Sequence, residues 1–256
     1  MSADIVTLEV SDFIAVVTLN RPPVNALNWA MRERLVSVFD EISERPDVRV
    51  AVLTGAGKVF CSGADLKDRP DPSRPGSFLS HNRITRETGN SIRECAKPVI
   101  AAVNGAALGA GLGLMASCDI YLASDAAVFG MPEINVGLAG GASMLRTLFG
   151  RSTLRRMFYT GIRLSADELY RRGIIEMCTS RDDLMPEAMK IAKEIAAKSP
   201  LAIGYAKQAT NMVDLMPQRD AYRFEQNFTM ALSRTEDAQE ARRAFLEKRE
   251  PVFKGR

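Results

Sequence analysis

Short apolar runs alternate with longer segments of helical spacing over the first two thirds of the chain. The short runs predict strands at 5–10, 14–19, 48–54, 98–103 and 120–123. The longer segments place apolar residues every three or four positions and predict helices at 29–43, 84–96 and 108–118. Strand and helix following each other in this way favour an α/β core with crossover helices over a β-sandwich.

From about residue 182 the helical periodicity continues almost to the end, with helix starts indicated at Ser199-Pro200 and at Thr235. We therefore expect an α/β core over residues 1–199 and a helical region over 200–256. Apolar side chains are frequent in that region, and such a surface favours contact with another subunit over packing on its own core. They are Met212, Leu215, Met216, Phe224, Phe228, Met230 and Leu232.

The charge balance argues against a nucleic-acid-binding protein. Lys and Arg number 34 against 31 Asp and Glu in 256 residues, which gives a net charge of +3. The first residues lack a basic segment followed by an apolar one, and no apolar stretch reaches the roughly 20 residues that span a bilayer. We expect a cytoplasmic protein with no membrane partner.

Cysteine and histidine are too sparse for several kinds of site. The four cysteines, Cys61, Cys95, Cys118 and Cys178, show no CxxC spacing, so we expect reduced thiols and no metal. His81 is the only histidine, and no nucleophile pattern surrounds it. A solvated histidine near a helix start is favoured over one that touches the substrate.

Residues 97–119 are rich in glycine where a strand passes into a helix. Gly109, Gly111 and Gly113 occupy alternate positions, although each glycine costs roughly 1 kcal/mol against alanine in a helix. Either tight packing or a backbone amide directed at a ligand oxygen explains them. Residues 60–66 end a strand in small residues in the same way, and two such amides on one oxygen would form an oxyanion hole.

Glu133 stands in an otherwise apolar stretch, 127–137. Burial there would raise its pKa, and such a carboxyl can exchange protons near neutral pH. Alternatively, Glu133 caps a turn or pairs with an arginine such as Arg146. The proline-rich polar segment 68–77 is either a mobile loop beside a ligand or an inert surface excursion.

Together these segments resemble the crotonase, or enoyl-CoA hydratase/isomerase, superfamily along nearly the whole chain. The similarity is carried by Leu19-Asn20-Arg21-Pro22, Asn25-Ala26-Leu27, 53–57, 60–66, 97–119, 129–137 and 244–249. The resemblance implies a spiral of repeated ββα units, a C-terminal helical trimerisation region, and a homotrimer or dimer of trimers. It also implies an acyl-CoA thioester substrate, with coenzyme A as part of the substrate and no permanently bound cofactor.

The resemblance also implies roles for individual residues. The oxyanion-hole amides would be those of Ala64 and Ala110, with Glu133 as the acid/base. Lys248, from a neighbouring subunit, would meet the nucleotide phosphate, unless it is a solvated cation at a helix end. The remaining positions expected to bind substrate are Ala26, Ser62, Gly63, Asp65, Leu66, Gly109, Pro132 and Gly141.

Gly113 departs from the family pattern. Two-carboxylate hydratases have a glutamate there and a second at the position of Glu133, so the residues disfavour two-carboxylate hydration. A double-bond shift needs one base, and hydration with one glutamate, with Tyr205 or Tyr222 assisting, is nearly as well favoured. Dehalogenases and dienoyl isomerases of the superfamily have a carboxylate at the position of Gly141, so neither of these reactions is expected here.

The alternative to an enzyme is an acyl-CoA-binding or structural paralogue that lacks catalytic activity.

Overall fold

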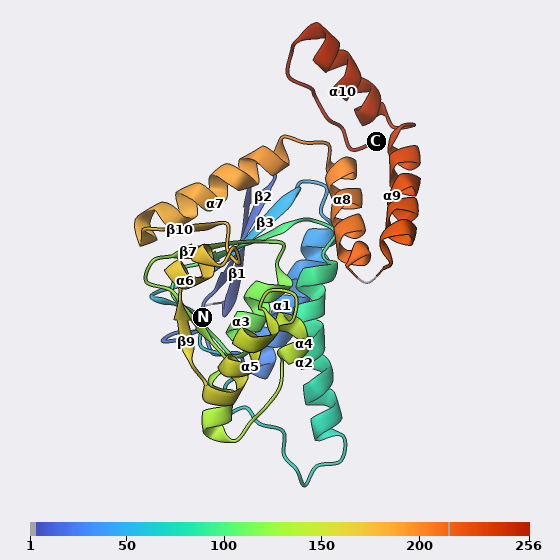
Figure 1. Ribbon diagram of the computed structural model, residues 1–256. Coiled ribbons are helices and arrows are strands. Elements are labelled where there is room, and N and C mark those ends of the chain that lie inside the picture. Colours follow the sequence, from blue (N-terminus) through green and yellow to red (C-terminus); the bar gives the residue numbers. More distant parts are fainter. Residues whose placement is uncertain (1–3, 215) are drawn as a thin grey trace.

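The computed structural model describes residues 4–214 and 216–256, so Leu215 lies outside the described residues (Figure 1). The chain opens with an antiparallel hairpin of β1 (Val6–Ser11) and β2 (Ile14–Leu19), followed by α1 (Trp29–Glu44). Asn28 caps α1, because its side chain accepts a hydrogen bond from the Met31 N–H at 3.0 Å. The predicted hairpin and first helix are thereby confirmed.

Pairs of strands then repeat, and a helix follows each of the first two pairs. The elements are β3 (Val50–Gly55), β4 (Val59–Cys61), α2 (Ser77–Glu94), β5 (Val99–Val103), β6 (Ala106–Leu108), α3 (Ala110–Ser117), β7 (Ile120–Ser124) and β8 (Val128–Gly130). The first strand of each pair joins a six-stranded sheet of order β1-β2-β3-β5-β7-β10, and the second joins a four-stranded sheet of order β4-β6-β8-β9. This is the expected spiral of ββα units.

The six-stranded sheet is covered on both faces. Alternate residues of β3 point to opposite sides: Ala51 and Leu53 join the core that includes α1, whereas Val50 and Val52 pack with α7 (Arg181–Ala196). Figure 1 shows α7 lying across the sheet on the side away from α1. Burial on both faces explains why β3 and β5 are continuous apolar runs.

Several boundaries differ from the sequence expectation. Helix α2 begins at Ser77 rather than at residue 84, because its first turns expose Phe78 and Leu79 and so show no buried apolar face. Leu108 belongs to β6, and α3 begins two residues later. The short elements that the sequence did not predict are η1 (Pro132–Val136), α4 (Ala142–Leu145), α5 (Arg151–Thr160), β9 (Arg163–Ser165), α6 (Ala166–Arg171) and β10 (Met177–Thr179), together with β6 and β8.

Three helices follow, namely α8 (Pro200–Val213), α9 (Gln218–Leu232) and α10 (Glu236–Glu247). Helix α9 packs beside α8, and α10 extends away from the sheets (Figure 1). Among the described residues, no helix combines the length and apolar character needed to cross a membrane.

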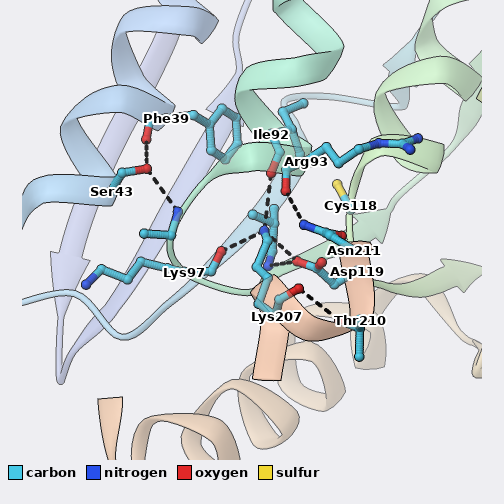
Figure 2. Close-up of polar contacts among 12 residues, drawn as sticks. Phe39, Ser43, Ile92, Arg93, Lys97, Cys118, Asp119, Lys207, Thr210 and Asn211 are labelled. Carbon is cyan, nitrogen blue, oxygen red and sulfur yellow. Dashed lines mark hydrogen bonds and ion pairs between the residues drawn. The ribbon is translucent and has the colours of Figure 1, made fainter. Parts of the chain in front are cut away.

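An ion pair between a buried lysine on α8 and Asp119 joins α8 to the core. Lys207 is 6% exposed and donates hydrogen bonds to Asp119 Oδ2 at 2.9 Å and to the carbonyl oxygens of Lys97 and Ile92. Asp119 Oδ2 also accepts from the Val99 N–H at 2.6 Å. Figure 2 shows these contacts converging on the Lys207 Nζ between α8 and the start of β5.

Candidate active site

The turn between β6 and α3 presents a free backbone donor. Gly109 has φ +54°, and its N–H donates to the Gly130 carbonyl at 2.8 Å. Ala110 is the first residue of α3, so its N–H has no partner within the helix. Within the described part of the chain it forms no other hydrogen bond, so it is available to a ligand.

The loop after β4 presents a second donor beside the first. Leu27 forms a parallel bridge with Ala64: the Leu27 N–H donates to the Gly63 carbonyl at 2.8 Å, and its carbonyl accepts from Asp65 at 2.9 Å. In such a bridge the N–H of Ala64 points away from Leu27. A Cβ placed on Gly63 would lie 3.6 Å from the Ala110 nitrogen, so the two donor segments adjoin.

Glu133 lies against the turn between β6 and α3. A Cβ on Gly109 would be 2.1 Å from Glu133 Oε1, so only glycine leaves room for the carboxyl. Oε2 is buried and has no hydrogen-bond partner among the described residues, and Glu133 forms no ion pair there with Arg146 or another cation. Burial raises the pKa of Glu133, as its apolar sequence context predicted.

The glycines of the segment divide between packing and site access. A Cβ on Gly111 would lie 2.2 Å from the Cys61 carbonyl oxygen, so this glycine permits close packing of α3 against β4. A Cβ on Gly113 would instead meet the Met144 methyl at 3.3 Å and its sulfur at 3.5 Å. A thioether therefore fills the space beside position 113.

Residues of the expected substrate cleft form one polar cluster. Arg21 pairs with Asp65 at 2.7 Å and donates to the Ala26 carbonyl at 2.8 Å. The Lys67 N–H and the Arg21 guanidinium hold the pKa of Asp65 below its usual range. Ser62 is half-buried, whereas Leu66 is 54% exposed. Asp65 thus fixes the loop that carries Ala64.

Pro132 and Gly141 belong to the segment that carries Glu133. Pro132 begins η1, and Gly141 precedes α4 in a left-handed conformation with φ +87°. A Cβ on Gly141 would lie 3.1 Å from the Met131 methyl, two residues before Glu133. Pro132 thus adjoins Glu133 in the chain, and Gly141 lies against the side chain of Met131.

Other predicted residues lie elsewhere. Lys248 is exposed at the end of α10, which Figure 1 shows remote from α3, so its expected role requires a neighbouring subunit. Tyr205 stacks on Phe228 with ring centroids 5.0 Å apart, and Tyr222 is 64% exposed on α9. His81 is half-buried near the start of α2, where it lines a cavity together with Trp29 and Asp68.

All four cysteines are free, as expected. Burial raises the pKa of Cys61 to about 12, so this thiol beside the site is protonated and a poor nucleophile. In residues 4–214 and 216–256 no three His, Cys, Asp or Glu side chains gather as metal ligands. Met144 is the neighbour that the sequence did not predict, because the four-residue helix α4 gives no periodic signal.

The family model described as enoyl-CoA hydratase/isomerase matches residues 9–256. The chain belongs to the enoyl-CoA hydratase/isomerase family. It is 38% identical to the Bacillus subtilis protein YngF over 96% of each chain, and 36% identical to the (E)-benzylidenesuccinyl-CoA hydratase of Thauera aromatica over 98% of this chain and 99% of that one. An enoyl-CoA hydratase from Bacillus anthracis superposes with a TM-score of 0.93 at 32% identity, covering 99% of this chain and 100% of the other.

Proposed function

We propose that this enzyme of the enoyl-CoA hydratase/isomerase family shifts the double bond of an enoyl-CoA thioester with Glu133 as its one acid/base. The thioester oxygen accepts hydrogen bonds from the Ala64 and Ala110 N–H groups. Each such donor contributes on the order of 3 kcal/mol to the stabilisation of developing negative charge. The carboxyl of half-buried Glu133 carries the proposal, because its Oε2 has no hydrogen-bond partner among the described residues and it lies against Gly109, next to Ala110.

The proton moves in two steps. The Glu133 carboxylate removes a proton from the α-carbon of a 3-enoyl-CoA, and the electrons of that C–H bond delocalise onto the thioester oxygen. The resulting dienolate then takes the same proton from Glu133 at the γ-carbon, which gives the 2-enoyl-CoA. No atom is gained or lost, so one carboxyl suffices.

The environment of Gly113 favours the double-bond shift over hydration. A second carboxyl at this position would help to hold the water that adds to the double bond, but the space adjoins the thioether of Met144. An apolar neighbour offers a water molecule no strong hydrogen-bond partner. Proton transfer within the substrate needs no such water.

Hydration is the second candidate, favoured by the relatives, of which two are named as hydratases. In that reaction Glu133 would give its proton to the α-carbon while the hydroxyl of a water molecule bonds to the β-carbon, and the other proton of that water would return to the Glu133 carboxylate. The substrate remains an enoyl-CoA, and the oxyanion donors keep the same role. The two reactions differ in the direction of proton transfer at the α-carbon and in whether water adds to the β-carbon.

A substrate panel with product analysis tests the proposal. Purified enzyme is incubated with a 3-enoyl-CoA, crotonyl-CoA and an aromatic enoyl-CoA, and products are identified by mass and ultraviolet absorbance. We expect the 3-enoyl-CoA to gain conjugated absorbance without a change of mass. If the main product is instead heavier by one water molecule, about 18 mass units, the enzyme is a hydratase and not an isomerase. Tight binding without any conversion would indicate an acyl-CoA-binding paralogue instead.

We also propose that residues 200–256 assemble the enzyme as a homotrimer or a dimer of trimers. Phe245 and Leu246 are 82% and 80% exposed on α10, an apolar surface that another subunit would cover. Assembly would also carry Lys248 to a neighbouring acyl-CoA. Light scattering of the intact protein measures the subunit number, and a monomer would contradict this proposal.

A further inference from the structure

The side chain of Met144, on α4, lies between a glycine of α2 and a glycine of α3. A Cβ placed on Gly89 would be 3.0 Å from the Met144 methyl, and a Cβ on Gly113 would be 3.3 Å from the same methyl. Helix α4 packs beside α3, and Figure 1 shows both next to α2. Glycine is unfavourable inside a helix, but at these two positions it leaves room for the thioether.

The thioether of Met144 lies about one helical turn from the carboxyl of Glu133. The Gly113 N–H donates to the Gly109 carbonyl at 3.1 Å, which places Gly113 one turn, about 5.4 Å, along α3 from Gly109. Glu133 Oε1 fills the space in front of Gly109, and Met144 fills the space in front of Gly113. Cα–Cβ bonds in a helix tilt towards its N-terminus, so the space at position 113 faces the end of α3 that begins with Ala110.

A thioester bound as proposed directs its acyl chain towards Met144. Its oxygen lies at the Ala64 and Ala110 amides, and its α-carbon lies within reach of the Glu133 carboxyl. Coenzyme A is far larger than a short acyl group, so it leaves on the open side of the site, where Ala64 and Leu66 are exposed. The acyl carbons beyond the α-carbon then take the buried side, along α3 towards position 113.

The backbone around Met144 is anchored. The Met144 N–H donates to the Gly141 carbonyl at 3.1 Å, and the next residue, Leu145, is fully buried. The Leu145 carbonyl accepts hydrogen bonds from the N–H groups of Leu148 and Phe149, both at 3.1 Å. Helix backbone encloses the Met144 methyl on two sides, so an acyl chain that reaches the thioether meets a wall.

We propose that Met144 is a specificity-determining residue that ends the acyl pocket, so that the enzyme binds short acyl groups and excludes long ones. The inference rests on the proposed function, from which it takes the positions of the thioester oxygen and the α-carbon. It specifies the substrate class as short-chain enoyl-CoA thioesters with a hydrocarbon end, because a thioether is an apolar neighbour. One methylene too many in an apolar pocket reduces selection of a substrate by about 10- to 200-fold.

Calorimetric binding of saturated acyl-CoA thioesters tests the proposal without requiring turnover. We expect the wild type to bind decanoyl-CoA about tenfold more weakly than pentanoyl-CoA. Met144→Ala removes the thioether and should bind decanoyl-CoA at least as tightly as pentanoyl-CoA. Met144→Leu keeps a similar volume and should keep the wild-type preference. Met189→Ala is the matched control, because Met189 is also half-buried but packs on α7, and it should keep the preference as well.

Three outcomes would overturn the proposal. They are a wild type that binds decanoyl-CoA as tightly as pentanoyl-CoA, a preference for the short ligand that survives Met144→Ala, and an equal loss of affinity for both ligands in that variant. Both alanine variants should lower the melting temperature, and Met144→Val replaces Met144→Ala if the latter does not fold. Turnover of a 3-enoyl-CoA tests the proposed function separately, because binding of saturated ligands does not require Glu133 to move a proton.

Discussion

Two regions of the molecule bury charged groups in opposite ways. Between α8 and β5, Lys207 has three acceptors, and Asp119 Oδ2 has two donors. Beside Ala110, which carries one of the proposed oxyanion donors, Glu133 Oε2 is buried without any hydrogen-bond partner in the described chain. Buried polar groups are normally satisfied, so the first region stabilises the fold, whereas we propose that the second leaves Glu133 free for a ligand. Substitutions in the two regions should therefore affect different properties.

The largest expected effect is that of Glu133→Gln, which keeps the shape of the side chain and removes its proton transfer. We expect kcat to fall by about 10²- to 10⁴-fold, the usual contribution of a general acid/base. The affinity for pentanoyl-CoA and the stability should be retained. Steady-state kinetics with the active substrate of the panel measure the effect, and turnover within twofold of the wild type would exclude Glu133 as the acid/base.

Lys207→Met should have the converse effect. It removes the three hydrogen bonds that the buried Lys207 Nζ donates and should destabilise the protein by about 1.5–3 kcal/mol, measured by urea unfolding. Lys190→Met is the control, because the Lys190–Glu187 pair is 3.7 Å apart with a 69% exposed lysine, so a change below about 1 kcal/mol is expected. Equal losses of stability in the two variants would show that the contacts of Lys207 do not stabilise the fold more than an exposed ion pair does.

Ala110→Pro removes one proposed oxyanion donor at a position where proline is tolerated. Ala110 is the first residue of α3, and the first helical turn needs no N–H there. We expect turnover to fall by about 10²- to 10³-fold with little change in melting temperature. Ala110→Gly keeps the donor and should remain active. If both variants are equally active, the Ala110 amide does not stabilise the enolate.

The smallest expected effect is the dependence of activity and of stability on pH. Burial raises the pKa of Glu133, so its carboxylate form, and with it kcat/KM, should be lost as pH falls through a value above the ordinary ~4.3 of glutamate. The raised pKa also means that protonated Glu133 favours the folded state at low pH, and this contribution is lost as pH rises through the folded pKa. Relative to Glu133→Gln, the wild type should therefore become less stable with rising pH.

The sequence predicted those features of the site that follow from neighbouring residues in the chain or from the family resemblance. The apolar neighbours of Glu133 indicated a raised pKa, and the glycines around Ala110 indicated close backbone approach. The Lys207–Asp119 pair could not be predicted in this way, because the two residues are 88 positions apart in the chain. The start of α2 was missed because exposed Phe78 and Leu79 resemble a loop pattern.

The most direct test of the central claim, that Glu133 and the two amides suffice for proton transfer at the α-carbon, is hydrogen exchange in a saturated thioester. Butanoyl-CoA has no double bond to hydrate or shift, so incorporation of deuterium from D₂O at its α-carbon reports enolate formation alone. We predict that the wild type catalyses this exchange, and that Glu133→Gln binds butanoyl-CoA equally well but leaves the exchange at the buffer rate. Exchange at the wild-type rate in Glu133→Gln, or none in the wild type with ligand bound, would contradict the account.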